Sequence, residues 1–218
     1  DIYSMSIENN SYNDNSTSNS SASQLSNNIG NNNCSKLCMV ATDRLSSFNK
    51  VLCNIPHKGE IINKISAWWF DKTKHIVANH IVNDYSLSRK YANASIVKKC
   101  TVFPIEFVMR AYMTGNTETS IWMNYSNGSR DYCGYTLRDG YNKNDKLDEI
   151  ILTPTTKSDV NDELISKEII IEKGIMTREY YETCEKHAYN LFRFGQEVLL
   201  KKGLILVDTK YEFGRDTM

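Results

Sequence analysis

The residues best suited to chemistry are three ionisable side chains at alternate positions near the end of the chain, Asp208, Lys210 and Glu212. Because strand side chains alternate between two faces, an extended segment would place all three on one face. Two carboxylates with an ammonium between them suit a magnesium nucleotide, since hard oxygens bind the cation and the lysine neutralises phosphate. Spacing alone slightly favours another interpretation, a ladder of cross-strand salt bridges on a solvated face.

The segments before these residues are expected to hold them in place. Leu204 to Val207 is an unbroken apolar run, which predicts a buried strand leading directly into Asp208. Upstream, a helix is predicted from Thr177 to about Lys202, with Gly203 as its C-terminal cap. Its apolar stripe, expected in the core, consists of Tyr181, Cys184, Ala188, Leu191, Gly195 and Val198.

A second candidate is Arg110, in a stretch from Thr101 to Tyr112 that predicts a strand. A guanidinium beside apolar neighbours needs a partner, and a bound phosphate or carboxylate explains it as well as a structural glutamate does. Pro104 lacks a ladder donor, which predicts an edge strand or a crossing between lobes. Alternation places on one face Glu106, Val108, Arg110 and Tyr112.

Two further stretches could bind anions. Pro56–Gly59 precedes a helix predicted from Glu60 to about Lys72, and N–H groups at a helix start can hold phosphate, although an ordinary loop is the favoured interpretation. Residues 150–157 predict a strand ending in a hydroxyl-rich loop with Lys157, which binds anions or is simply exposed. The first helix is expected to bury an aromatic face with Ile61, Ile65, Trp68 and Trp69.

The other elements are mixed without a regular βαβ period, which predicts an α+β fold. Thr42–Phe48 is expected to be a polar loop, Thr117 to begin a helix through Trp122, and Asn127-Gly128 to turn a hairpin. Further strands are predicted at Ile2-Tyr3, Leu37–Ala41, His75–Val82 and Ser95–Val102.

Residues from about Glu8 to Asn33 are almost all asparagine, serine and other small polar types. So little apolar surface cannot offset the entropy of ordering, which predicts a disordered insertion at a hairpin tip. The chain begins at Asp1 rather than methionine, and we interpret it as an internal fragment.

Composition limits the function classes. The chain has 218 residues, 40% of them hydrophobic, which suffices for a substantial core. Lys+Arg and Asp+Glu are equal at 26 each, so net charge argues against nucleic-acid or anionic-membrane partners. No apolar run approaches the ~20 residues that cross a bilayer. Six cysteines without paired zinc spacing indicate free thiols in a reducing compartment.

Five collinear stretches resemble one family. They are A-T-D-R-L-S-S-F (41–48), I-P-H-K-G (55–59), F-P-I-E-F-V-M-R-A-Y-M-T-G (103–115), I-L-T-P-T-T-K (151–157) and G-L-I-L-V-D-T-K-Y-E-F-G-R (203–215). In this order they are similar to the SAICAR synthetases (phosphoribosylaminoimidazole-succinocarboxamide synthases), in particular the plant-like branch. The resemblance overturns the preference for a salt-bridge ladder.

The resemblance implies an ATP-dependent ligase of purine biosynthesis. It would join L-aspartate to 5-amino-1-(5-phosphoribosyl)imidazole-4-carboxylate (CAIR), giving SAICAR, ADP and phosphate through an acyl phosphate. The implied fold is a two-lobed α+β fold like ATP-grasp proteins and protein kinases, with ATP between the lobes. We expect an N-terminal lobe at residues 1–103 and an incomplete C-terminal lobe at 104–218.

The resemblance also implies site residues, with ATP and Mg²⁺ as cofactors. Catalytic residues would be Lys210, Arg110, Lys157 and Asp162; the metal would be held by Asp208 and Glu212. ATP would contact Lys99, Cys100, Val102, Lys210 and Glu212. The substrates would contact Asp43, Arg44, Ser46, Lys58, Arg110, Thr114, Gly115 and Asn116. A cytoplasmic or plastid location and a homo-oligomer are compatible with it.

This chain departs from the family pattern at three positions: Asn49 replaces an aspartate, Asn116 a serine and Asn161 a histidine. The family's lysine loop would precede Asp1 and its Asp-Glu and Ser-Arg motifs would follow Met218, so we expect no appreciable turnover from these residues alone. Two alternatives stay open: a non-catalytic nucleotide-binding protein of this fold, and a different carboxylate–amine ligase or small-molecule kinase.

Overall fold

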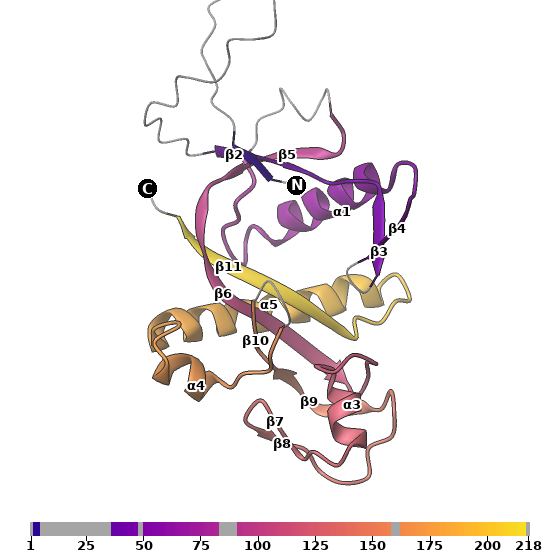
Figure 1. Ribbon diagram of the computed structural model, residues 1–218, viewed down its shortest axis with the longest axis vertical. Helices are drawn as coiled ribbons and strands as arrows, with labels where there is room; N and C mark the ends of the chain where they lie inside the picture. Colours follow the sequence, from indigo (N-terminus) through magenta and orange to yellow (C-terminus); the bar gives the residue numbers. More distant parts are fainter. Residues whose placement is uncertain (1, 5–35, 48–49, 83–90, 158–161, 217–218) are drawn as a thin grey trace, which may run out of the picture. The chain divides into compact units, whose positions relative to one another are not determined.

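The computed structural model describes residues 2–4, 36–47, 50–82, 91–157 and 162–216. The chain divides into two compact units, whose helices and strands are labelled in Figure 1. Unit 1 contains the residues up to Lys74 together with Asn79–Lys99; unit 2 contains His75–Ala78 and Cys100–Met218. The strand pairs of the described part are antiparallel and are accompanied by helices, which confirms the predicted α+β class. The predicted insertion, Cys34, Asn49 and Asn161 lie outside the described residues.

Unit 1 contains an antiparallel sheet in the order β1 (Ile2–Ser4), β2 (Lys36–Val40), β5 (Ala94–Lys98). The strands predicted at Ile2-Tyr3 and Leu37–Ala41 are therefore confirmed, and they pair directly with each other. The strand predicted at His75–Val82 is wrong, because residues 74–76 form a turn, Val77 lies in a bend, and Ile81 makes only an isolated bridge to Val97.

A hairpin replaces the polar loop that was expected at Thr42–Phe48. Its strands are β3 (Arg44–Ser47) and β4 (Lys50–Asn54). Polar residues can form strands here because the pairing satisfies backbone N–H and C=O groups while the side chains stay largely in solvent. The helix predicted to follow is confirmed as α1 (Lys58–Thr73), and it starts two residues earlier than Glu60.

The apolar stripe of α1 is mostly exposed, so the prediction that it forms a core face is wrong. Ile61, Ile65 and Trp68 keep 55, 52 and 45% of their surface, and only Trp69 of the stripe is half-buried. Gly59 is the buried residue of this helix, because its backbone lies against that of Ala41. Helical periodicity was therefore present without the burial that normally accompanies it.

Unit 2 is built on the long strand β6 (Cys100–Tyr112). On one edge β6 pairs with β11 (Asp208–Asp216), and on the other with β9 (Lys146–Leu152) and β10 (Thr155–Thr156). The predicted strand at Thr101–Tyr112 is confirmed. Pro104 does not mark an edge strand, because β6 is central; the proline lies where the β6–β11 register shifts, between Glu212 and Gly214.

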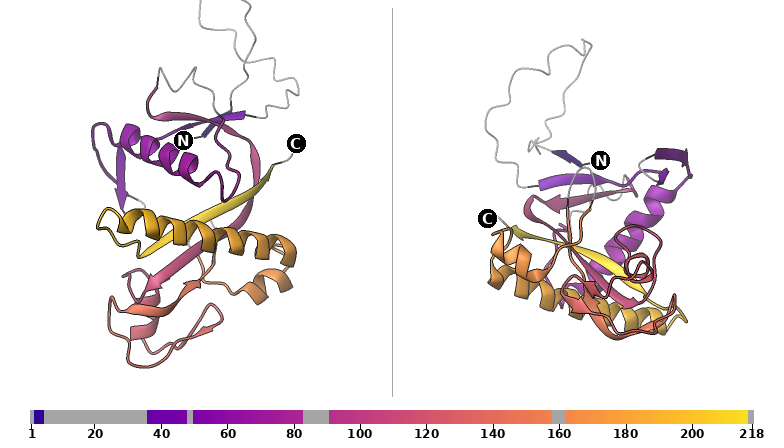
Figure 2. Two further views of the ribbon diagram at one scale, coloured as in Figure 1. Left: turned by 180° about the vertical axis from the view of Figure 1, so that it is seen from behind. Right: turned by 60° about the horizontal axis from the view of Figure 1, so that its bottom comes forward.

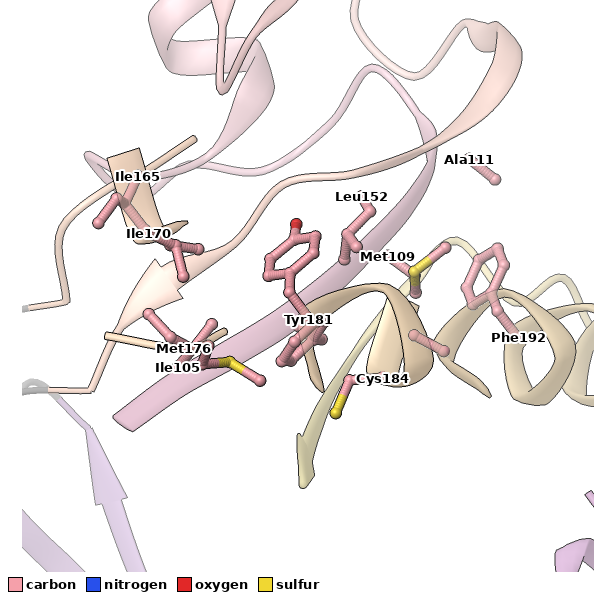
Figure 3. Packing of buried hydrophobic residues seen from close by; sticks show 12 residues of the cluster. Ile105, Met109, Ala111, Leu152, Ile165, Ile170, Met176, Tyr181, Cys184 and Phe192 are labelled. Carbon is pink, nitrogen blue, oxygen red and sulfur yellow. The ribbon is translucent and has the colours of Figure 1, made fainter. Parts of the chain in front are cut away.

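Helices α4 (Lys167–Glu172) and α5 (Arg178–Leu200) pack on this sheet, and α5 crosses β6 and β11 in every view (Figures 1 and 2). The predicted long helix is confirmed, and Thr177 accepts a capping hydrogen bond from the Tyr180 N–H at 3.3 Å. The buried cluster between helix and sheet contains Ile105, Phe107, Met109, Ala111, Leu152, Ile165, Ile170, Met176, Tyr181, Cys184, Ala188 and Phe192 (Figure 3).

The link from α5 to β11 differs from the expected buried strand. Gly203, at φ 73°, ends the helix as predicted, and the Leu204 N–H donates back to the Leu199 carbonyl at 3.0 Å. Leu204 and Ile205 are 55 and 64% exposed and belong to no strand. Because Leu204 takes part in the hydrogen bonds of the helix cap, it is not available to pair with a strand of the sheet.

The segment after β6 contains a second group of corrections. The expected helix begins later, as α3 (Ile121–Ser126), and Asn127-Gly128 ends it instead of turning a hairpin. The hairpin lies further on, where Cys133 and Gly134, both at positive φ, join β7 (Asp131–Tyr132) to β8 (Tyr135–Thr136). In the described part of the chain, no helix has the length and apolar character needed to cross a membrane.

Candidate functional site

Strand β11 presents its ionisable residues on one face, as alternation predicts. Asp208, Lys210 and Glu212 have side chains 46, 53 and 45% exposed. Tyr211 and Phe213 point the other way and pack on the core of unit 2. In the register with β6, Asp208 lies opposite Arg110, and Glu212 opposite Glu106. The two sets of candidate residues from distant parts of the sequence therefore share one face of the sheet.

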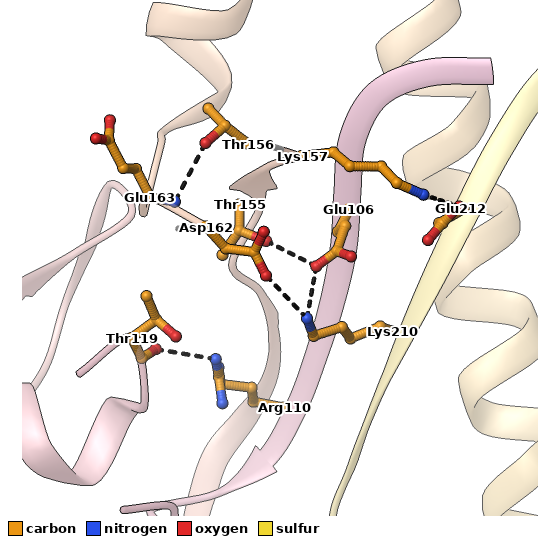
Figure 4. A network of polar contacts seen from close by, with 10 residues as sticks. All are labelled: Glu106, Arg110, Thr119, Thr155, Thr156, Lys157, Asp162, Glu163, Lys210 and Glu212. Atoms are coloured by element: carbon orange, nitrogen blue, oxygen red, sulfur yellow. Dashed lines mark hydrogen bonds and ion pairs between the residues drawn. The ribbon is translucent and has the colours of Figure 1, made fainter. Parts of the chain in front are cut away.

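Lys210 is the centre of a polar network on this face (Figure 4). Its Nζ lies 2.6 Å from Glu106 Oε2 and 3.4 Å from Asp162 Oδ2. The hydroxyl of Thr155 also donates to Glu106 Oε2, at 3.2 Å. Partial burial acts to lower the pKa of Lys210, but the hydrogen bond and charge of Glu106, with help from Asp162, outweigh burial and raise that pKa. The ammonium is therefore charged at neutral pH.

Glu106 and Glu212 face each other across the two strands. Like charges directly opposite on a sheet repel, and each of these carboxylates has a lysine as its partner. Lys157 Nζ lies 2.6 Å from Glu212 Oε2, and Lys210 Nζ lies at the same distance from Glu106 Oε2. Sequence reasoning assigned no role to Glu106, although alternation had already placed it on the face of Arg110.

Arg110 is buried, with a side chain 8% exposed. Its Nε donates to the Thr153 hydroxyl at 2.8 Å and its Nη2 to the Thr119 carbonyl at 3.2 Å. The nearest carboxylate recorded for it is that of Asp208, 3.8 Å from Nη1, which makes an ion pair but exceeds hydrogen-bond distance. The structural glutamate considered from sequence is not the partner that the structure shows.

The turn of Thr114, Gly115 and Asn116 lies shortly before Thr119, whose carbonyl accepts the hydrogen bond from Arg110. Gly115 has φ 107°, and a Cβ there would lie 2.3 Å from the Cβ of Ser120, so only glycine fits. Asn116 Oδ1 accepts a hydrogen bond from Lys143 Nζ at 2.7 Å. The longer side chain at position 116 is therefore used to hold a second cation beside the turn.

Comparison with known proteins decides the family. A family model described as SAICAR synthetase matches residues 28–218. The chain belongs to the SAICAR synthetase family. The chloroplastic phosphoribosylaminoimidazole-succinocarboxamide synthase of Vigna aconitifolia is 51% identical over 179 residues, 82% of this chain and 51% of that protein. The synthase of Legionella pneumophila strain Lens is 46% identical over 181 residues, 83% of this chain and 56% of that protein.

Solved structures agree with this SAICAR synthetase assignment. The SAICAR synthase of Saccharomyces cerevisiae, complexed with SAICAR, superposes with a TM-score of 0.72 at 27% identity, covering 83% of this chain and 62% of that one. A SAICAR synthetase in complex with ADP gives a TM-score of 0.63 at 26% identity, covering 84% and 70%. The chain spans about half the length of the first curated relatives that it matches.

The candidate substrate residues of this family member that lie in unit 1 are Asp43, Arg44, Ser46 and Lys58. Asp43 Oδ1 accepts a hydrogen bond from the Gly59 N–H at 2.9 Å, so this carboxylate caps the start of α1. That contact occupies one of the N–H groups that the sequence offered to phosphate. Arg44 Nε donates to the Thr42 hydroxyl at 3.2 Å, Ser46 is exposed on β3, and Lys58 is the first residue of α1. Their substrate contacts stay predictions.

The residues expected at the adenine lie where β6 begins. Lys99 is exposed, Cys100 is half-buried and Val102 keeps 51% of its surface. Gly214 of β11 approaches this segment closely, since a Cβ on it would lie 3.0 Å from the Thr101 carbonyl oxygen. A side chain at position 214 would require the neighbouring backbone to shift by a few tenths of an ångström. The assignment of ATP to this segment stays a prediction.

The magnesium assignment can be tested against the spacing of the strand. Asp208 and Glu212 are four positions apart, which on a strand rising roughly 3.3 Å per residue means about 13 Å. No cluster of three or more possible metal ligands occurs among the described residues. Mg²⁺ is normally held by one or two carboxylates together with substrate phosphates. The facing pair Glu106 and Glu212 fits that requirement better than Asp208 and Glu212 do.

Proposed function

We propose that the protein carrying this chain is an ATP-dependent ligase that joins L-aspartate to the carboxylate of CAIR, giving SAICAR, ADP and phosphate. Membership of the SAICAR synthetase family supports it, as do relatives solved with SAICAR and with ADP. The observation that carries it is the shared face of β6 and β11. Arg110, Lys210 and Lys157 there supply three cations for phosphate and carboxylate groups.

The chemistry needs such a face because a carboxylate is a poor acyl donor. In the proposed reaction a carboxylate oxygen of CAIR attacks the γ-phosphorus of ATP, and the bond from that phosphorus to the bridging oxygen breaks to release ADP. The aspartate amine then attacks the acyl phosphate, a C–N bond forms, and phosphate leaves with the former carboxylate oxygen. A protein assists these steps by positioning reactants and neutralising developing charge.

Lys210 and Lys157 are suited to neutralise nucleotide phosphates, since both are charged and partly exposed. Each is now paired with a glutamate, so binding of a nucleotide exchanges a carboxylate partner for a phosphate. We assign Mg²⁺ to Glu212 together with Glu106; bound there, the ion would neutralise charge on the phosphates. Arg110 and the turn from Thr114 to Asn116 are assigned to the phosphate of the ribotide, and Asp162 to substrate placement.

An assay of the full-length gene product tests the proposal. With CAIR, L-aspartate, ATP and Mg²⁺ we expect one ADP and one phosphate for each SAICAR formed. Lys210→Ala is expected to lower kcat/KM by roughly 100-fold or more, as loss of a charged group at the reacting phosphate does. Lys186→Ala, on the exposed side of α5, is the matched control and should leave it unchanged.

Two results would count against the proposal. Nucleotide binding without any SAICAR would favour the non-catalytic alternative, and turnover with a different acid in place of CAIR would favour another ligase on this fold. Two plant relatives are named as chloroplastic enzymes. We propose a cytoplasmic location, with the plastid as the alternative, to be decided by imaging the tagged full-length protein.

A further inference from the structure

The guanidinium of Arg110 is oriented by a residue that has no place in the family motifs quoted above. One of its hydrogen bonds goes to the carbonyl of Thr119, at 3.2 Å from Nη2. The same carbonyl oxygen accepts a hydrogen bond from the hydroxyl of Tyr132, at 2.6 Å. Tyr132 and Arg110 therefore share one acceptor, and that acceptor belongs to the segment that follows the Thr114–Asn116 turn.

Tyr132 also contacts Arg110 through its ring. The Arg110 Cζ lies 5.8 Å from the ring centroid, within the range of a cation–π contact. Tyr132 is only 2% exposed, so its hydroxyl needs a protein partner, and the Thr119 carbonyl is that partner. Burial raises the pKa of Tyr132, although the charge of Arg110 acts to lower it. The phenol thus stays neutral and remains a hydrogen-bond donor.

Backbone pairing of β6 fixes the Cα of Arg110 but not the orientation of its long side chain, so that orientation depends on side-chain contacts. The guanidinium of Arg110 is anchored at Nε by its bond to Thr153, whose hydroxyl also donates to the Val108 carbonyl at 3.2 Å. Beyond Nε, Nη2 donates to the Thr119 carbonyl, whereas Asp208 lies beyond hydrogen-bond distance of Nη1. Because both N–H donations lie in the plane of the guanidinium, the bond to Thr119 sets the direction in which the Nη1 edge faces.

We propose that Tyr132 is a positioning residue: it holds the Thr119 carbonyl, and thereby turns the Nη1 edge of Arg110 toward the open face shared with Asp208 to receive an anionic group of the substrate. This inference rests on the proposed function for its consequence in catalysis. The orientation of Arg110 itself rests on the contacts alone.

The variant Tyr132→Phe keeps the ring and removes the hydroxyl. The first measurement is NMR of the arginine side chain, with the Arg110 signal assigned by its loss in Arg110→Lys. In the wild type we expect slow exchange of the Nε proton and restricted rotation of the Nη groups. In Tyr132→Phe the rotation should be at least several-fold faster. Freely rotating Nη groups in the wild type, or no difference in the variant, would overturn the proposal.

Tyr141→Phe is the matched control. Tyr141 belongs to the same buried cluster as Tyr132, is 8% exposed, and its hydroxyl accepts a hydrogen bond from the Asp148 N–H at 3.2 Å. It lies outside the recorded contacts of Arg110. A purely structural role for Tyr132 predicts that both variants lower the unfolding midpoint alike and leave the Arg110 signal alone.

The second measurement is steady-state kinetics of the full-length protein. Tyr132→Phe should raise the KM for CAIR about five-fold, the factor expected for one weakened hydrogen bond, with kcat changed less than about two-fold. Tyr141→Phe should change neither. A loosened guanidinium with an unchanged KM would also overturn the proposal. A wild type without ligase activity would refute the proposed function instead, and the NMR measurement would still decide whether Tyr132 orients Arg110.

Discussion

Helices α1 and α5 have similar sequence patterns and opposite outcomes. Both repeat apolar residues at helical spacing, yet α5 buries Tyr181, Ala188 and Phe192, whereas α1 exposes about half of Ile61 and Ile65. The difference is what each helix meets inside its own unit. The sheet around β6 gives α5 a continuous apolar face. Periodicity therefore identifies which side of a helix is apolar, and only tertiary structure decides whether that side is covered.

The largest expected difference is in the free energy of unfolding when an aromatic side chain of each helix is truncated to alanine. Phe192→Ala in α5 should lower the free energy of unfolding by about 3–5 kcal/mol, because a fully buried ring leaves a cavity. Trp68→Ala in α1 should change it by less than about 1 kcal/mol, since the indole is 45% exposed. Urea denaturation followed by circular dichroism measures both. A loss of similar size in the two variants would mean that α1 is covered in solution.

The second effect concerns how the two helices start. Asp43→Ala should destabilise the protein by about 1–2 kcal/mol, and Thr177→Ala by about 1 kcal/mol, as losses of N-terminal caps do. Asp43 caps from a distant part of the sequence, whereas Thr177 caps its own helix. Asp43→Asn keeps an acceptor oxygen and should stay within about 0.5 kcal/mol of wild type. Thermal unfolding measures these effects. An Asp43→Ala variant of unchanged stability would mean that this carboxylate does not cap α1 and is available to bind substrate.

The two units should also differ in their response to pH. In unit 1, burial lowers the pKa of His80. The unfolded histidine then binds a proton that the folded one does not, so stability is lost as the pH falls below about 6.5. Tryptophan fluorescence of a Trp122→Phe variant, which keeps Trp68 and Trp69 in unit 1, reports this loss. His80→Gln should abolish it, and a wild-type signal unchanged down to pH 5 would contradict the expectation.

In unit 2 the same argument runs toward high pH. Burial raises the pKa of both Cys133 and Cys184 to about 11. An unfolded thiol ionises near pH 8.5, so the folded state binds more protons and stability is lost as the pH rises from there toward 11. Cys184→Ala should reduce the slope of unfolding free energy against pH. Alkylation at pH 8 should modify the exposed Cys53 well before Cys184.

The smallest expected effect on stability comes from the charged network. Lys157 and Glu212 are each nearly half exposed, so Glu212→Gln should change the free energy of unfolding by less than about 1 kcal/mol. The same change should weaken binding of the magnesium nucleotide to the full-length protein at least several-fold. Calorimetry gives both numbers. A change in stability without a change in nucleotide binding would mean that these residues form only a ladder of salt bridges, the interpretation that their spacing first favoured.

The two halves of the site face were predictable from sequence because each depends on strand alternation alone. The period of two sufficed to place Asp208, Lys210 and Glu212 on one face of their strand and Arg110 on one face of its own, whereas the pairing that joins these faces did not follow from it. The partners of these residues were not predictable. That Glu106 faces Glu212 depends on the register of two strands about a hundred positions apart in the sequence, and nothing local sets that register.

Turn chemistry explains most of the errors. Asn127-Gly128 suits a hairpin and a helix end equally, because both need a glycine at positive φ. The real hairpin uses Cys133, a residue that seldom adopts φ 53° and that no turn rule would select. Leu204 and Ile205 were assigned to a core strand on hydrophobicity alone, and the helix cap at Gly203 excluded them from it.

The pairing of β1 with β2 provides a site at which a segment can be inserted or replaced. Ser4 stands opposite Leu37, and facing Cα atoms in such a ladder lie only about 5 Å apart. A connection between them can change length at little thermodynamic expense, since each doubling adds only about 0.6 kcal/mol of closure entropy. A two-residue turn or an entire reporter domain could therefore be grafted between these positions with the β1–β2 pairing kept.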